Sequence, residues 1–295
     1  MNLVPQILSV LKSGRAQKVL LVPKTPILMK VGKRMTPADP NAIASPQDVR
    51  DTLTGLATMA NYQIIMGSSR ASDGTFTSST QDLGRIRVNF IIQRGTPVIF
   101  VERVPSRIPA LREAVPEAET LKDLLELLES KTGVVLFTGS DADGVSDVIY
   151  AALKHVNDTQ NRIVYTVEKP LRYLLNNNKS VVIQREVKVD VESVAQGIIQ
   201  SQFLETDILY VDDIPDRESL ENLIQVANRE TLCLARFPSR TPMLAIKALH
   251  HLHSSESLFI QVLRELILGV VHMEERGKLI LYTSPAEKDA LFYGD

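Results

Sequence analysis

The chain has 295 residues, 44% of them hydrophobic, and a net charge of −2, which is enough apolar material and length for about two globular domains. This near-neutral charge gives no reason to expect nucleic-acid binding or adsorption to a membrane surface. No stretch approaches about 18 consecutive apolar residues and the start carries no basic segment followed by an apolar one, so we expect a cytoplasmic chain without membrane insertion.

The first third of the chain predicts a small α+β module. Residues 18–31 are rich in Val, Leu and Ile and predict a pair of strands. Ser45-Pro46-Gln47-Asp48 predicts the capped start of a helix that ends near residue 60. The Ser/Thr/Gly/Asp-rich stretch 68–82 predicts a mobile loop. Two further strands are predicted, at 84–90 and 96–103.

Residues 108–118 are predicted to be a linker, and beyond them helices and strands alternate. This alternation predicts a parallel sheet with crossover helices, whose ligand crevice lies at the carboxyl ends of the strands. The predicted helices are 119–130, 145–156, 190–202 and 217–228, and the predicted strands are 133–138, 161–167, 207–211 and 231–236. Residues 241–295 predict two or three helices and a short strand at 279–282.

The chemically informative segment is an apolar strand that runs into Gly139-Ser140-Asp141-Ala142-Asp143-Gly144 and then into an amphipathic helix. A Gly-x-x-x-x-Gly frame in this place is typical of a phosphate-binding loop, in which amides, a helix N-terminus and a lysine hold phosphates. The lysine position is Val145, although Ser146 keeps the hydroxyl. The segment therefore predicts a nucleotide-binding architecture that has lost its cation.

Three carboxylates, Asp141, Asp143 and Asp147, crowd the same segment. Each would repel a phosphate oxygen about 4 Å away by about 4 kcal/mol at an effective dielectric of about 20. We expect side-chain caps from Asp143, Ser146 or Asp147 to replace the phosphate and order the loop. A calcium loop is excluded, because the EF-hand spacing puts a glycine and a tyrosine at ligand positions.

For several other residues that could bind a metal or react chemically, a purely structural role is the favoured alternative. Asp212 and Asp213, at the end of a predicted strand, could hold a metal through water or cap the next turn, and capping is favoured. His250, His251 and His253 lack a neighbouring cysteine or paired carboxylate, which favours a solvated helix end over a metal site. The single cysteine, Cys233, lies in an apolar run and is expected to be a buried thiol.

Five segments in order carry a family resemblance: Arg85-Ile86-Arg87-Val88-Asn89, Arg103-Val104-Pro105-Ser106, residues 166–173, Gln184-Arg185-Glu186-Val187 and residues 207–218. They resemble the R-F-R-V-N strand, the R-x-I-P-S linker, the T-I-E-D-P-I-E-F acidic box, the Q-R-E-V segment and the Walker B region of the PilT-like type IV pilus and type II secretion ATPases. The resemblance runs from about residue 17 to about residue 270.

The resemblance implies a PAS-like N-terminal domain at 1–107 and a RecA-like P-loop NTPase domain at 119–295 with a shortened helical C-terminal part. It places Glu168 and Asp213 at catalytic positions, as vestiges. It assigns the degenerate nucleotide site to Gly139, Gly144, Val145, Ser146, Asp147, Arg85, Arg87 and Arg185. For the arginines, a solvated or salt-bridged role is an equal alternative.

Departures from the family pattern fall on the chemistry. The acidic box has Lys169 for its aspartate, and the histidine box has Pro238 for its histidine. Phe203 and Pro215 replace arginines near Walker B, and Lys18-Val19-Leu20 replaces an N-terminal D-L-H element. Because so many positions have changed, we expect that catalysis is not under selection.

The sequence therefore predicts a pseudo-ATPase that docks with, regulates or scaffolds a type IV pilus or type II secretion motor. The alternatives are a slow or partner-completed ATPase with weak ATP and Mg²⁺ binding, and a structural ring component without nucleotide. No cofactor is expected. The expected partners are the chain itself, PilT/PilB-like motors and an inner-membrane platform protein, at which the chain would be peripheral. We expect an interface between the N-terminal module and a neighbour's RecA-like domain, weakened by charge reversal at Arg85 and Arg87 with little change in folding.

Overall fold

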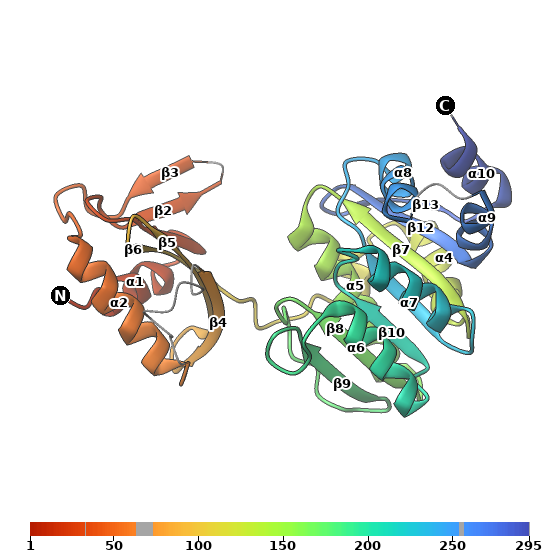
Figure 1. Ribbon diagram of the computed structural model, residues 1–295, viewed down its shortest axis with the longest axis horizontal. Coiled ribbons are helices and arrows are strands. Elements are labelled where there is room, and N and C mark those ends of the chain that lie inside the picture. Colours follow the sequence, from red (N-terminus) through yellow and green to blue (C-terminus); the bar gives the residue numbers. More distant parts are fainter. Residues whose placement is uncertain (33, 63–72, 254–256, 295) are drawn as a thin grey trace. The chain divides into compact units, whose positions relative to one another are not determined.

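The computed structural model describes residues 1–32, 34–62, 73–253 and 257–294. The chain forms two compact units, Met1–Ser106 and Arg107–Asp295, each with a sheet and a hydrophobic core of its own (Figure 1). No helix in the described part of the chain is long and apolar enough to cross a membrane.

The first unit is an antiparallel sheet of six strands in the order β3-β2-β1-β6-β5-β4. Its elements are α1 (Val4–Lys12), β1 (Lys18–Leu21), β2 (Leu28–Val31), β3 (Arg34–Pro37), α2 (Pro46–Met59), β4 (Asp73–Thr80), β5 (Gly84–Gln93) and β6 (Thr96–Arg103). The predicted start of α2 is confirmed, because Ser45 and Asp48 form a reciprocal capping box.

Side chains alternate between the two faces of this sheet. On β5, Ile86, Val88 and Phe90 are buried and belong to the cluster that α1 and α2 also enter. Arg85 and Arg87 alternate with these residues along the strand and therefore project from the other face. The residues that resemble the family's R-F-R-V-N strand are thus split between the core and the opposite face of the sheet.

The prediction of a loop at 68–82 is wrong for residues 73–80, which form β4; residues 68–72 lie outside the described residues. β4 pairs with β5 from Asp73 opposite Ile91 to Thr80 opposite Gly84. Its few apolar residues gave no strand signal, because only Phe76 and Ser78 face the core. Pairing with a strongly apolar neighbour overrode the local composition. Helix α1 and strand β3 were also not predicted.

The second unit is a sheet of seven strands in the order β13-β12-β7-β11-β10-β8-β9, parallel except for β13 at one edge. Its strands are β7 (Gly133–Gly139), β8 (Ile163–Glu168), β9 (Val181–Glu186), β10 (Ile208–Val211), β11 (Leu232–Arg236), β12 (Ile267–Glu275) and β13 (Lys278–Tyr282). Its helices are α3 (Leu111–Ala114), α4 (Ala118–Leu128), α5 (Ala142–Thr159), α6 (Val194–Ser201), η1 (Gln202–Leu204), α7 (Arg217–Ala227), α8 (Pro242–His253), α9 (Ser257–Leu266) and α10 (Pro285–Tyr293). This confirms the predicted parallel sheet with crossover helices.

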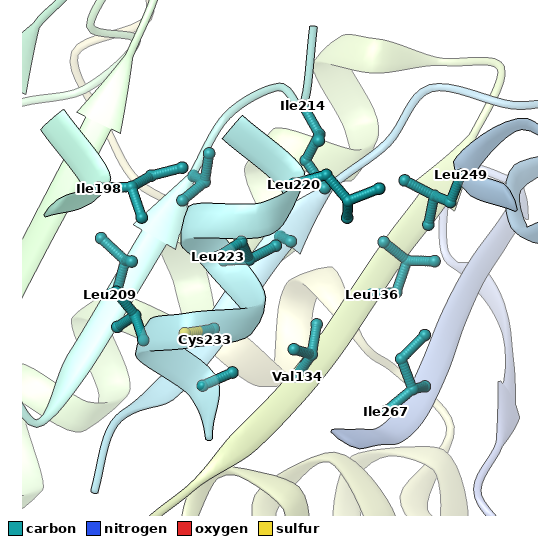
Figure 2. Packing of buried hydrophobic residues seen from close by; sticks show 14 of the residues in the cluster. Val134, Leu136, Ile198, Leu209, Ile214, Leu220, Leu223, Cys233, Leu249 and Ile267 are labelled. Carbon is teal, nitrogen blue, oxygen red and sulfur yellow. The ribbon is translucent and has the colours of Figure 1, made fainter. Parts of the chain in front are cut away.

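Helices cover both faces of the second sheet. Helices α3, α4 and α5 pack against one face, and α6, α7, α8, α9 and α10 pack against the other. Figure 2 shows the second of these layers, a single cluster that includes Val134 and Leu136 of β7, Leu220 and Leu223 of α7 and the buried Cys233 of β11. Because central strands are buried on both faces, their sequences are nearly continuous apolar runs, which is why the pattern identified them.

Four parts of the second unit differ from the sequence-based expectation. Strand β9 was not predicted, and β12 occupies a stretch assigned to helices. A short helix, α3, lies within the predicted linker. Helix α5 begins at Ala142, three residues before the predicted start at 145, which shortens the loop after β7.

Candidate functional site

The segment between β7 and α5 is too short to be an open phosphate-binding loop. Only Ser140 and Asp141 separate the end of β7 at Gly139 from the first residue of α5. The Asp141 carboxylate accepts a hydrogen bond from the Gly144 amide at 3.2 Å, and the Asp141 carbonyl accepts one from the Val145 amide at 3.0 Å. Two amides that would face a phosphate therefore donate to the chain itself. The predicted caps, Asp143, Ser146 and Asp147, are wrong, because Asp141 is the N-cap.

Val145 faces the core. Its side chain is 3% exposed and belongs to the cluster between α5 and the sheet. A Cβ atom on Gly139 would lie 2.8 Å from Val145 Cγ2 and 3.0 Å from the Met273 carbonyl, and one on Gly144 would lie 2.7 Å from Met273 Sδ. Both glycines of the motif thus have a packing reason, since they let β7 and α5 approach each other and β12. Ser146 is also buried.

Two arginines pair with the three carboxylates of this segment. Arg172 donates to Asp147 through Nε at 3.2 Å and Nη2 at 3.0 Å, and its Nη1 pairs with Asp143. Arg276 donates to Asp141 Oδ2 at 2.8 Å and to Asp147 Oδ2 at 3.3 Å. The carboxylates also lie near the N-terminus of α5, where the helix dipole favours negative charge. The acidic cluster is therefore compensated within the chain.

Glu168 is enclosed at the end of β8. Its side chain has no exposed surface; the Tyr150 hydroxyl lies 2.6 and 2.7 Å from its two oxygens, and the Thr166 hydroxyl donates at 2.7 Å. Burial, followed by the charge of Asp212, raises the pKa of Glu168 to about 7. Burial also raises the pKa of Tyr150 well above its ordinary value. Glu168 is thus held by buried hydroxyls rather than exposed to a crevice.

The two aspartates after β10 have different surroundings. Asp212 accepts hydrogen bonds from Arg236 at 2.8 and 3.0 Å and from the Tyr210 hydroxyl at 2.7 Å. Asp213 is exposed, and its carboxylate accepts a hydrogen bond from the next amide, that of Ile214, at 3.0 Å. Within the described residues, no group of three His, Cys, Asp or Glu side chains could hold a metal ion.

The arginines predicted to contact nucleotide lie apart from this segment, and two of them, Arg87 and Arg185, interact with residues close to them in the fold. Arg87 pairs with Glu102 at 2.9 Å, with 12% and 14% of the two side chains exposed, and Lys18 also pairs with Glu102. Arg85 is half-buried on the same strand. Arg185 lies on the edge strand β9, where it donates to the Tyr165 hydroxyl at 3.3 Å and to the Asp190 carbonyl. The structure therefore groups residues 139–147 and Glu168 around α5, with Arg185 at the sheet edge and Arg85 and Arg87 in the first unit.

The structural roles expected for Cys233 and for the histidines of α8 are only partly confirmed. Cys233 is fully buried, as expected. His253 is only 9% exposed, pairs with Glu221 at 3.1 Å and stacks on Phe259 at 3.6 Å, so the prediction of a solvated helix end is wrong for it.

Sequence patterns missed the groups that complete this site, namely Tyr150, Arg172, Tyr173 and Arg276. Tyr150 reaches Glu168 from α5, Arg172 and Tyr173 reach Asp147 from the segment after β8, and Arg276 reaches it from the turn between β12 and β13. Nothing in the spacing of these residues pointed to the site. With two amides committed to Asp141, Val145 buried and the carboxylates already paired, the residues at the start of α5 do not fit the phosphates of a nucleotide or the magnesium ion that accompanies them.

The amino-acid sequence matches a known protein family and several curated proteins. Residues 97–270, more than half of the chain, match the family described as "Type II/IV secretion system protein". The "Type IV pilus ATPase PilU" of Pseudomonas aeruginosa is 26% identical over 227 residues, covering 77% of this chain and 57% of that protein. The "Type IV pilus retractation ATPase PilT" of the same organism is 27% identical over 153 residues, covering 52% and 43%. The chain spans about half the length of these curated relatives.

Solved structures show the same fold. The "Crystal Structure of the Pilus Retraction Motor PilT and Bound ADP" superimposes with a TM-score of 0.77 at 21% identity, covering 99% of this chain and 86% of that one. The Legionella pneumophila ATPase DotB gives a TM-score of 0.75 at 18% identity, covering 99% and 83%. The predicted fold, a small N-terminal domain followed by a RecA-like domain, is confirmed. The PAS-like description of the first domain stays a prediction.

Proposed function

The chain belongs to the type II/IV secretion system protein family, and from that premise we propose that it is a catalytically silent member that docks with a pilus or secretion motor and regulates or scaffolds it. The observation that carries the proposal is the start of α5, where Asp141 takes the Gly144 and Val145 amides. Phosphoryl transfer depends on positioned donors and cations around the phosphates. A chain that uses these donors internally has little left to offer a nucleotide.

The surroundings of Glu168 support the same proposal. In the family resemblance this carboxylate stands at a catalytic position, where it would have to reach water or a metal-bound oxygen. Here Tyr150 and Thr166 occupy its oxygens and no part of it is exposed. A buried carboxylate whose partners are hydroxyl groups of the core stabilises a fold more readily than it activates a solvent molecule.

The partner we propose is a motor ATPase of the same family, alone or with an inner-membrane platform protein, and the site of action is the cytoplasm. The relatives named above are pilus ATPases, and the regions that resemble them include the 85–89 strand and the 103–106 linker outside the nucleotide pocket. Retention of these regions beside a changed pocket is the expected result if assembly outlived catalysis. Self-association into a ring is the second form that this proposal takes.

The rival proposal is an ATPase completed by cations from a neighbouring subunit. The contacts of Arg87 with Glu102 and of Arg185 with Tyr165 and Asp190 weigh against it, because these arginines already have partners within their own units. A partner would have to supply new cations and also displace Arg172 and Arg276 from the carboxylates.

The test is steady-state ATP hydrolysis by the purified chain, by a PilT-like motor from the same host, and by the two together. We expect the chain alone to match a buffer control and to change the motor's rate or its retention in a pull-down. A catalytically inactive variant of the motor serves as the control that assigns any turnover in the mixture. Turnover by the chain alone near 1 s⁻¹, roughly the low end for ordinary enzymes, and its loss in Glu168→Ala would contradict catalytic silence.

A further inference from the structure

Asp147 accepts hydrogen bonds from two distant parts of the chain. Its Oδ1 atom accepts hydrogen bonds from Arg172 Nε at 3.2 Å, Arg172 Nη2 at 3.0 Å and the Tyr173 hydroxyl at 2.7 Å. Its Oδ2 atom accepts one from Arg276 Nη1 at 3.3 Å. Asp147 itself lies in the first half of α5, 25 residues from Arg172 and 129 residues from Arg276 in sequence.

These donors come from the segments that border the carboxyl ends of the strands. Arg172 and Tyr173 lie in the segment after β8, and Arg276 lies in the turn between β12 and β13. In a parallel sheet, ligands bind at the carboxyl ends of the strands, and a bound ligand there would connect the loops that follow the strands. Here a side chain of α5 makes the connections.

The arrangement has two arms, the contact of Asp147 with Arg172 and the contacts of Arg276 with Asp147 and Asp141, and they differ in strength. Arg172 is 15% exposed and Asp147 is 18% exposed, so their two-point contact is largely shielded from water and salt. Arg276 is 61% exposed, and a pair at that exposure contributes little by itself. Its second contact, with the cap residue Asp141, fixes the β12–β13 turn to the helix start at two points.

We propose that Asp147, Arg172 and Arg276 form a permanent ionic clamp that orders the start of α5, the segment after β8 and the β12–β13 turn without nucleotide. The clamp holds the RecA-like unit in one arrangement, so the chain presents a fixed surface to its partners while a nucleotide-dependent motor changes shape. This inference rests on the proposed function, because it assigns to the chain's own side chains the ordering role that a bound nucleotide has in a motor.

Hydrogen exchange of the full-length protein, followed by mass spectrometry, tests the clamp. Asp147→Asn keeps the size of the side chain but removes the charge that both arginines share. We expect amides in 142–148, 169–175 and 274–278 to exchange roughly tenfold faster, the effect of losing charged hydrogen bonds that restrain local opening. Asp158→Asn, at the other end of α5 in an exposed pair with Lys154, is the matched control and should leave these segments unchanged.

A second variant separates the arms and guards against unfolding. Arg276→Gln breaks only the exposed arm, so faster exchange should be confined to 274–278 and the first turn of α5. Unchanged exchange in both Asp147→Asn and Arg276→Gln would overturn the clamp. The wild-type protein with ATP and Mg²⁺ forms a separate arm: no change in protection is expected, whereas new protection at 139–148 would contradict the proposed function and leave the results of the variants standing.

Discussion

At the scale of single residues, Glu168 connects the site to the pH dependence of stability. Its pKa is raised from 4.5 to about 7 in the folded chain, so the folded state holds this proton more tightly than the unfolded state does. The resulting stabilisation is fully present below pH 4.5 and is lost as the pH rises through about 7. Glu168 therefore raises the free energy of unfolding at acidic pH, and this contribution is absent at alkaline pH.

We expect the Glu168→Gln variant to lose this dependence. Between about pH 5 and pH 8, the free energy of unfolding of the wild-type protein should fall relative to that of the variant by roughly 2–3 kcal/mol. Urea unfolding at several pH values gives the difference profile, with Glu126→Gln on the exposed face of α4 as the control. Parallel profiles for the wild-type protein and Glu168→Gln would mean that Glu168 is ionised throughout.

Arg87 is a second residue whose surroundings change an expectation. The sequence predicted that Arg87 is exposed and that reversing its charge changes folding little. The predicted exposure is wrong, because the Arg87 side chain is only 12% exposed and pairs with Glu102, which is the salt-bridged alternative. Arg87→Glu should lower the free energy of unfolding by roughly 3 kcal/mol, since it sets two carboxylates against each other in a shielded place. Urea unfolding measures this, and Arg94→Glu in the exposed turn of the same hairpin should change it little. Equal values for the two variants would refute the buried pair.

At the scale of elements, the packing between β7 and α5 determines whether a lysine at position 145 could restore a phosphate-binding loop. Val145 packs against Gly139 and Met273, so its position is a core position rather than the mouth of a loop. A lysine there would have to carry its amine out of a packed layer or give up its proton. The two glycines of the motif are present, while the side chain at the lysine position, Val145, serves the packing of α5.

Val145→Lys should therefore fail to restore ATP hydrolysis and should destabilise the fold by roughly 3 kcal/mol. Thermal unfolding and a hydrolysis assay on the same preparation check both parts. Val189→Lys, at a position that is 72% exposed, is the matched control and should leave the melting temperature unchanged. Hydrolysis gained by Val145→Lys without loss of stability would mean that the segment can still open into a phosphate-binding loop.

At the scale of the whole molecule, the two units each have a core and a sheet, so the chain offers two separate surfaces for assembly. The expected interface between the first unit and a neighbour's RecA-like domain stays a prediction. Charge reversal at Arg87 does not test this interface cleanly, because it would break the buried pair with Glu102 and disturb the first unit itself. Ile91, 55% exposed on the same strand β5, is a better position for a charge that weakens assembly alone.

Local sequence was sufficient where a residue's role depends on its near neighbours. The apolar runs of β7, β8, β10 and β11 and the capping box at Ser45 were predicted, because burial on both faces and side-chain caps leave their signature within a few residues. The ordered motifs, read together, were likewise sufficient to indicate the RecA-like fold.

Only the tertiary structure decided the rest. The segment 267–275, apolar mainly in its first five residues, suits a helix or a strand, and its pairing with β7 selected the strand β12. That pairing brings Met273 onto Gly144 and Arg276 onto Asp141, more than a hundred residues away in sequence, and these contacts accompany an early, closed start of α5. Contacts of this range leave no periodicity in either segment. The sequence by itself therefore determined which fold the chain adopts and which residues its motif has lost, and long-range packing determined what fills their place.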